Sequence, residues 1–194
     1  MSGRRVLTIP NLVSLARLAT VPIFWWVLLG EGEVTLAALL LIAVGSTDWV
    51  DGYLARRLNQ VTRLGAILDP VADRLMIASA IVAGLIAGII PSSLGIALLV
   101  REVIMTVVTL FVAARGAPVL QVRYLGKLAT FLLYGAIPLF YLANAGHLEG
   151  FFTPLAWLTG VIGLVLYWVV LVQYLGDARV ALAEVESPPN PQES

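Results

Sequence analysis

The sequence predicts an all-α membrane protein built as a bundle of six transmembrane helices. Hydrophobic residues make up 60% of the chain and charged residues only 12%, and the mean hydropathy is +0.94. These values are typical of integral membrane proteins. Because a transmembrane helix needs about 20 apolar residues, the 194 residues have room for about six such helices and short connections.

Six apolar segments, separated by short connections that contain Gly, Pro or charged residues, are the predicted spans. They run from Leu12 to Leu29, Val34 to Arg56, Leu68 to Ile90, Leu94 to Ala114, Tyr124 to Asn144 and Phe152 to Leu175. We expect one membrane domain over residues 1–186. The remaining stretch, SPPNPQES, is polar and Pro-rich, and we expect residues 187–194 to form a disordered tail.

The distribution of basic residues predicts the orientation of the bundle. The connections between spans one and two, three and four, and five and six contain no Lys or Arg. Basic residues instead precede span one, follow span six and occupy the other two connections: Arg4, Arg5, Arg56, Arg57, Arg63, Arg115, Arg123 and Arg179. Because short cytoplasmic loops carry the excess of Lys and Arg, we expect both termini in the cytoplasm. No convincing cleavage site follows MSGRR, which favours a bacterial-type plasma membrane.

Four aspartates lie at the predicted cytoplasmic ends of spans two and three. Asp48 and Asp51 are three residues apart, and Asp69 and Asp73 are four apart, so each pair shares one face of its helix. Antiparallel helices joined by a short connection are neighbours, and the two acidic faces can meet. Carboxylate oxygens suit Mg²⁺, which proteins usually share with substrate phosphates, and two ions about 4 Å apart need this many acids.

The small residues that share this stretch indicate what the metal would bind. Gly52, Ala55 and Gly65 leave space beside the helix backbone, so the pattern favours a phosphate-containing ligand held by metal. Two other interpretations stay open. The aspartates could only neutralise nearby arginines, namely Arg56, Arg57, Arg63 and Arg74, or they could mark the ion pathway of a divalent-cation transporter.

The stretch from Asp48 to Asp73 resembles the signature of the CDP-alcohol phosphatidyltransferase family, D-x₂-D-G-x₂-A-R-x₈-G-x₃-D-x₃-D. All eight fixed positions match: Asp48, Asp51, Gly52, Ala55, Arg56, Gly65, Asp69 and Asp73. The resemblance implies an enzyme that transfers the phosphatidyl group of CDP-diacylglycerol to a hydroxyl and releases CMP. It also implies Mg²⁺ or Mn²⁺, as two ions, on the four aspartates, with Asp73 as the general base. Gly52, Ala55, Arg56 and Gly65 would border the CDP-lipid.

Two further segments resemble those of the cardiolipin and phosphatidylglycerophosphate synthase branches. The opening of span one is similar to PNxxTxxR, and it adds Asn11, Ser14 and Arg17 to the expected CDP-lipid contacts. Residues 126–130, GKLAT, are similar to GKxKT, with Ala129 in place of the second lysine. A phosphomonoester such as glycerol 3-phosphate benefits from every nearby cation, so the missing lysine favours phosphatidylglycerol as acceptor and a cardiolipin synthase. A phosphatidylglycerophosphate synthase is the alternative.

The remaining charges suggest where the acceptor binds. Arg101 and Glu102 lie well inside span four, as a functional site or as a mutually compensating structural pair. Arg115, Arg123 and Lys127 form a basic cluster near spans four and five, which could receive an anionic head group. We therefore expect acceptor contacts from Arg101, Arg115, Arg123 and Lys127. The expected partners are both substrates, the lipid bilayer and a second copy of the chain in a homodimer, and not nucleic acid.

Overall fold

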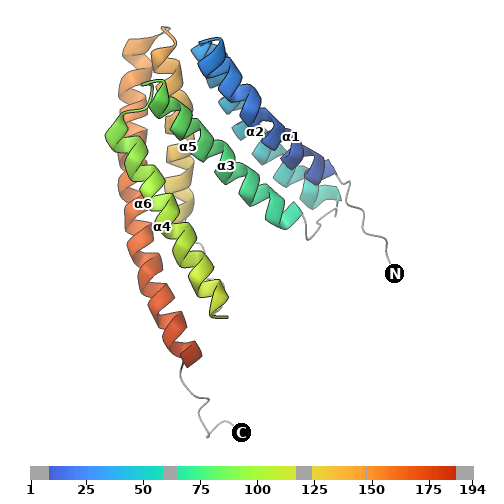
Figure 1. The fold of residues 1–194 in the computed structure, drawn as a ribbon, viewed down its shortest axis with the longest axis vertical. Helices are drawn as coiled ribbons and strands as arrows, with labels where there is room; N and C mark the ends of the chain where they lie inside the picture. Colours follow the sequence, from blue (N-terminus) through green and yellow to red (C-terminus); the bar gives the residue numbers. More distant parts are fainter. Residues whose placement is uncertain (1–8, 59–64, 117–123, 147, 187–194) are drawn as a thin grey trace, which may run out of the picture.

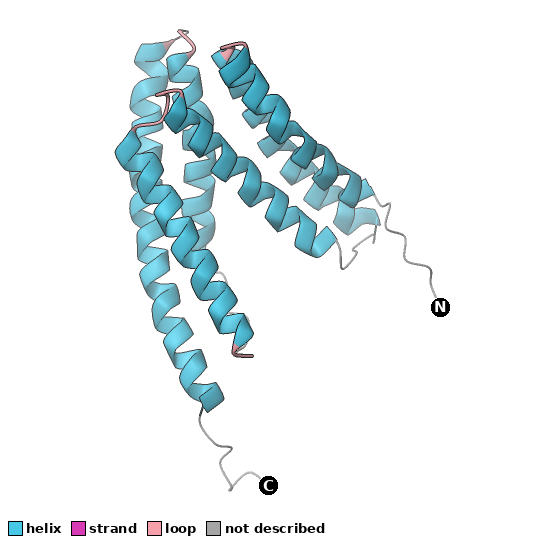
Figure 2. Ribbon diagram, in the orientation of Figure 1, coloured by secondary structure: helices cyan, strands magenta, loops and turns pink. Residues whose placement is uncertain are grey.

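The computed structural model describes residues 9–58, 65–116, 124–146 and 148–186 (Figure 1). Within these ranges the chain is entirely helices and short turns (Figure 2), so the all-α prediction is confirmed. The π-helical segment η1 (Trp26–Gly30) directly continues the first helix. The α-helices are α1 (Ile9–Trp25), α2 (Val34–Leu58), α3 (Gly65–Ile86), α4 (Ser92–Ala114), α5 (Tyr124–Asn144) and α6 (Glu149–Glu186).

The helices run alternately up and down, and α3 connects the first two helices, α1 and α2, with the last three, α4, α5 and α6. The turns that follow η1, α3 and α5 lie toward the upper end of the view in Figure 1, and α1 and α3 both begin at the lower end. Helix α3 contacts α1, α4 and α5, while α5 packs along α6 and also contacts α2. The beginning of α3, which carries part of the aspartate pattern, therefore lies at the same end as the beginning of α1 (Figure 1).

Several of these helices have the length and the surface of membrane spans. Among the described residues, α4, α5 and residues 149–183 of α6 are long and apolar enough to cross a bilayer, and residues 14–30 and 34–46 form shorter apolar stretches. The outer face of α4 is a continuous apolar stripe of exposed side chains: Ile96, Val100, Val103, Val107 and Leu110. A soluble monomer rarely exposes such a contiguous apolar surface. The chain is therefore a membrane protein.

The core lies where α1, α2, α3 and α5 meet. Tyr141 of α5 is fully buried there, packs its ring 5.7 Å from that of Phe24, and donates a hydrogen bond of 2.7 Å to the carbonyl oxygen of Ala80. A phenol needs such a partner when it is buried. This bond ties α5 to the middle of α3, next to the part of α3 that forms the site described below.

Helix α3 ends earlier than the sequence analysis expected, at Ile86 rather than Ile90. Gly88 adopts a left-handed backbone with φ of 70°. The amide of Ile89 donates to the carbonyl of Gly84 at 2.8 Å, and the amide of Gly88 to that of Leu85 at 3.2 Å. This pair of bonds is the Schellman arrangement, in which a glycine past the helix end caps the last carbonyls. The apolar run continues past Gly88, so hydropathy alone placed the boundary wrongly.

Helix α6 is longer than the predicted span, Phe152 to Leu175, and begins earlier, at Glu149. Its last turns pack on the end of α4, where Val112, Ala178 and Ala181 form a small buried cluster. This packing stabilises a helical extension that is too polar to be read as membrane-spanning. The prediction of one domain over residues 1–186 stays a prediction, and the predicted disordered tail, 187–194, lies outside the described residues.

The close packing of α3 against α5 predicts the effect of adding one methyl group. A Cβ at Gly84 would lie 2.8 Å from Ile90 Cδ1 and 2.9 Å from the Tyr141 hydroxyl. Overpacking of this kind costs about 1–3 kcal/mol, so Gly84→Ala should lower the thermal unfolding temperature in detergent micelles. Gly135→Ala, where a Cβ meets nothing within 4 Å, is the matched control and should be neutral or stabilise by up to about 1 kcal/mol. Equal melting temperatures for the two variants would contradict this packing.

Candidate active site

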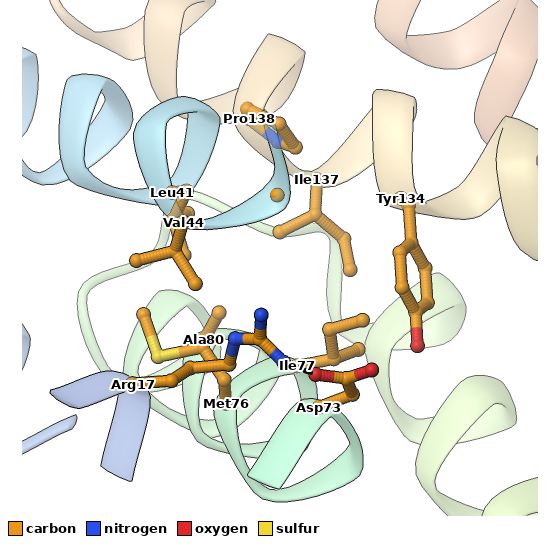
Figure 3. Close-up of a pocket in the computed structure, with 11 residues that line it drawn as sticks. Arg17, Leu41, Val44, Asp73, Met76, Ile77, Ala80, Tyr134, Ile137 and Pro138 are labelled. Atoms are coloured by element: carbon orange, nitrogen blue, oxygen red, sulfur yellow. Dashed lines mark hydrogen bonds and ion pairs between the residues drawn. The ribbon is translucent and has the colours of Figure 1, made fainter. Parts of the chain in front are cut away.

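A cavity opens between four helices at the level of the aspartate pattern (Figure 3). The apolar part of its wall comes from α2, α3 and α5, and three side chains with polar groups border it, namely Arg17 of α1, Asp73 of α3 and Tyr134 of α5. The cavity volume is about 60 Å³. The remaining described lining residues are Leu41, Val44, Gly45, Met76, Ile77, Ala80, Ile137 and Pro138. A polar side next to an apolar wall suits an amphipathic ligand.

Arg17 and Asp73 form an ion pair across the α1–α3 contact. Arg17 Nη1 donates a hydrogen bond to Asp73 Oδ1. The Arg17 side chain is 6% exposed and that of Asp73 28%, so both charges lie largely inside the protein. Burying a charge is costly unless an opposite charge accompanies it, and this pair meets that need. The predicted CDP-lipid contact and the predicted general base are thus brought together, and Ser14, one turn before Arg17, is buried on the same helix.

Tyr134 completes the polar side of the cavity from α5. In Figure 3 its ring extends from α5 so that the hydroxyl end points toward the side of the cavity where the Asp73 carboxylate lies. Tyr134 also borders a second, smaller cavity, together with Ile77, Ile137 and Glu102. Tyr134 was not among the site residues predicted from the sequence. The available signal was its position seven residues after Lys127, which places the two on one face of a helix.

The other three aspartates are placed by their backbone positions. Asp48 and Asp51 lie in the last turns of α2, and Asp69 lies in α3, one turn before Asp73. Val44 and Gly45, on α2 just before Asp48, border the same cavity as Asp73. Helices α2 and α3 therefore border one cavity, but the direct packing expected for neighbouring antiparallel helices is not found among the described residues. Helix α3 packs mainly on α1, and α2 packs mainly on α5.

The side chains of several predicted site residues lie outside the described set, so their roles stay predictions. These residues are Asn11, Asp48, Asp51, Gly52, Ala55, Arg56, Gly65 and Asp69, of which the structure describes only the helical backbone. The described side chains contain no group of three or more His, Asp or Glu that could hold a metal ion. Aspartate oxygens are nevertheless the ligand type that Mg²⁺ and Mn²⁺ prefer. The four aspartates of the sequence pattern therefore have the right chemistry to hold such an ion.

Arg101 belongs to a different polar cluster, between α4 and α6. Its Nη1 atom lies 3.3 Å from Glu102 Oε1, its Nε donates to the carbonyl of Tyr167 at 3.3 Å, and its guanidinium lies 3.4 Å from the centre of the Tyr167 ring. The Tyr167 hydroxyl also donates to Glu102. The predicted pairing of Arg101 with Glu102 is present. Arg101 is not among the residues that border the cavity of Asp73, and its expected contact with the acceptor stays a prediction.

The predicted basic cluster is described in part. Lys127 is exposed in the first turn of α5, and Arg115, directly after α4, is exposed with its guanidinium 4.8 Å from the centre of the Phe111 ring. Arg123 lies outside the described residues. Lys127 precedes Tyr134 by two helical turns, so α5 carries a cation on the approach to the cavity.

Comparison with known proteins decides the family. The profile of the CDP-alcohol phosphatidyltransferases matches residues 7–183, which is nearly the whole chain. The chain belongs to the CDP-alcohol phosphatidyltransferase family. The prediction made from the eight-position pattern is therefore confirmed, and the protein is a phosphatidyltransferase enzyme. Members of this family generally use a divalent metal.

Two relatives of this phosphatidyltransferase represent the two branches considered above. The cardiolipin synthase (CMP-forming) of Streptomyces coelicolor is 41% identical over 181 residues, covering 90% of this chain and 84% of the relative. The CDP-diacylglycerol–glycerol-3-phosphate 3-phosphatidyltransferase of Bacillus subtilis is 35% identical over 150 residues, covering 70% and 77%. The similarity thus extends to both branches.

The ion pair of the phosphatidyltransferase can be tested with a double-mutant cycle. Arg17→Met and Asp73→Asn should each lower the free energy of unfolding, because each leaves the other partner without its main countercharge. The double variant should lose less than the sum, with a coupling of about 0.5–3 kcal/mol. Thermal or denaturant unfolding in micelles measures all three, and Arg74→Met, at an exposed neighbouring position, should change stability by about 0.5 kcal/mol or less. Strict additivity of the two substitutions would contradict the pair.

Proposed function

We propose that this enzyme transfers the phosphatidyl group of CDP-diacylglycerol to a glycerol-type hydroxyl with release of CMP, and that phosphatidylglycerol is the acceptor, which makes it a cardiolipin synthase. The observation that carries the proposal is the cavity in which Asp73, the last residue of the family pattern, meets Arg17 beside an apolar wall. A charged side suits the reacting hydroxyl, and an apolar wall beside it suits the carbon atoms of a glycerol-type alcohol. The family match does not support the alternative of a cation transporter.

The proposed reaction is a substitution at phosphorus. The acceptor hydroxyl oxygen forms a bond to the phosphatidyl phosphorus, the bond from that phosphorus to the CMP oxygen breaks, and CMP leaves with the electron pair. The proton of the hydroxyl passes to the Asp73 carboxylate. A carboxylate serves as a general base when it lies within hydrogen-bond reach of the hydroxyl. Such transfers depend mainly on positioning and charge neutralisation, and Arg17 supplies a fixed cation at this position.

The metal ligands follow from the family pattern. Asp48, Asp51, Asp69 and Asp73 would hold the Mg²⁺ or Mn²⁺, as two ions, and bound metal would neutralise the pyrophosphate and the departing CMP. Gly52, Ala55, Arg56 and Gly65 would border the nucleotide, with Asn11, Ser14 and Arg17 approaching from α1. The location of Ser14 and Arg17 on the α1 face that packs on α3 supports this assignment for these two residues.

The preference for phosphatidylglycerol rests on the beginning of α5. Ala129, which stands where the phosphatidylglycerophosphate synthase pattern has a lysine, is fully buried in helix packing. Position 129 therefore offers no cation to a head group, whereas Lys127 is exposed. The expected cations of the acceptor site are then Arg115, Arg123 and Lys127, with Arg101 as a further candidate. This number of cations matches the single negative charge of a phosphodiester better than the near-double charge of a phosphomonoester. The identity to the Streptomyces coelicolor synthase points the same way.

The proposed arrangement in the membrane follows from the basic connections. We propose six spans in a bacterial plasma membrane with both termini and the cavity mouth toward the cytoplasm. The alternating helix directions support this, because they place the ends that adjoin basic segments together (Figure 1). A homodimer is proposed from the family resemblance alone.

The metal site predicts a sharp dependence on divalent cations. Release of CMP from CDP-diacylglycerol should stop in EDTA and return with Mg²⁺ or Mn²⁺. Asp48→Asn, Asp51→Asn or Asp69→Asn should each lower kcat/KM by at least about 10-fold, because one lost charge-assisted contact is worth about 1.5–3 kcal/mol. Asp177→Asn, in the C-terminal part of α6 and outside the predicted metal site, is the control and should keep wild-type activity. Full turnover of a variant in chelated buffer would exclude this metal site.

The acceptor assignment predicts which product accumulates. Purified enzyme given CDP-diacylglycerol and Mg²⁺ should form cardiolipin from phosphatidylglycerol at least about 10-fold faster than phosphatidylglycerophosphate from glycerol 3-phosphate, which is the factor expected for one missing charge-assisted hydrogen bond. Mass analysis of the lipids measures both products. Efficient product from glycerol 3-phosphate, with none from phosphatidylglycerol, would instead identify a phosphatidylglycerophosphate synthase.

A further inference from the structure

Tyr134 is the described cavity residue whose polar group has no assigned role in the proposed reaction. Of the three side chains that bring a polar group to the cavity, Asp73 is the proposed base and Arg17 is bonded to Asp73. The other described lining residues are apolar or glycine and cannot hydrogen-bond a ligand through a side chain. Tyr134 comes from a different helix, α5, and its hydroxyl end points to the Asp73 side (Figure 3).

The chemistry of the acceptor supplies a group for this hydroxyl to recognise. Phosphatidylglycerol and glycerol 3-phosphate both end in a vicinal diol, with the attacking primary hydroxyl next to a secondary hydroxyl. When the primary hydroxyl lies against Asp73, the secondary hydroxyl is one carbon away and needs a second polar neighbour. A tyrosine hydroxyl can both donate and accept a hydrogen bond, which suits an alcohol.

The size of the cavity agrees with this fragment. A water-sized group needs roughly 10–15 Å³ of such volume, so a cavity of about 60 Å³ accommodates about four to six of them. The end of a glycerol group has two carbons and two oxygens, which is four non-hydrogen atoms. Lys127 lies two turns earlier on the same face of α5, about 10 Å along the helix axis, where its flexible side chain can reach the phosphate of the same acceptor.

We infer that Tyr134 is a specificity-determining residue that hydrogen-bonds the secondary hydroxyl of a glycerol-type acceptor and so selects a vicinal diol over a simple alcohol. This inference rests on the proposed phosphatidyl transfer, but it holds for either acceptor. Asp73, the base, takes the proton of the primary hydroxyl, and Tyr134 hydrogen-bonds the secondary hydroxyl. Residues 127–134 of α5 would then contact the phosphate at one end and the diol at the other.

The experiment compares two acceptors that differ only in the secondary hydroxyl. Phosphatidylglycerol and phosphatidyl-1,3-propanediol are each presented in mixed micelles with CDP-diacylglycerol and Mg²⁺, and CMP release gives kcat/KM for each. One neutral hydrogen bond is worth roughly a 3- to 10-fold preference, so the wild type should prefer the diol by that factor. Tyr134→Phe should reduce the preference below about 2-fold and leave the KM for CDP-diacylglycerol unchanged, because the ring still fills its place.

Tyr141→Phe is the matched control on the same helix. Its hydroxyl bonds the Ala80 carbonyl and does not border the cavity, so this variant should melt at a lower temperature but keep the wild-type preference. A wild type with no preference for the diol would overturn the inference even if no variant folds, and so would a Tyr134→Phe variant that keeps the preference. A wild type that releases no CMP with either lipid would overturn phosphatidylglycerol as the acceptor, and the same comparison is then made with glycerol 3-phosphate and 3-hydroxypropyl phosphate. Equal rates with these two would overturn the inference, and no CMP release with any acceptor would overturn the proposed function and the inference together.

Discussion

The ion pair between Arg17 and Asp73 is the constraint on which the arrangement of this bundle depends. Two opposite charges inside an apolar protein stabilise each other only while their helices stay together, so the pair ties α1 to α3 at the site. Two turns further along, the Trp25 indole donates to the hydroxyl of Ser79, which continues the same contact between the helices. The α1–α3 contact is therefore polar at the cavity and again near the middle of the bundle.

A second, largely buried cluster of compensating polar groups lies between α4 and α6. Arg101, Glu102 and Tyr167 satisfy one another within an apolar environment, and their cluster borders a cavity that shares Ile77, Tyr134 and Ile137 with the first. Without a hydrophobic driving force between helices in lipid, such polar contacts and close packing hold a bundle together. Because Ile77, Tyr134 and Ile137 border both cavities, α3 and α5 each contribute to the surroundings of both clusters.

The sequence was most informative where a fixed spacing of functional residues coincided with helical periodicity. The aspartate pattern predicted the family, and the apolar runs predicted the existence and order of the helices. Boundaries that depend on backbone conformation or on distant packing were less predictable. Gly88 ends α3 although the run stays apolar, and the extension of α6 is stabilised by Val112 of α4. Tyr134 was missed because an aromatic residue within a span is ordinarily a packing residue, and only the tertiary fold places it beside Asp73.

The length of α6 has a practical consequence for handling the protein. Its 38 residues extend about 57 Å at 1.5 Å per residue, against a hydrocarbon thickness of about 30 Å. The packing of Ala178 and Ala181 on Val112, within the predicted span of α4, divides the excess length of α6 between the two membrane surfaces. Only about the last turn of α6, after Ala181, extends past the end of α4. A fluorescent reporter or affinity handle attached there would therefore need its own linker to stand clear of the lipid head groups.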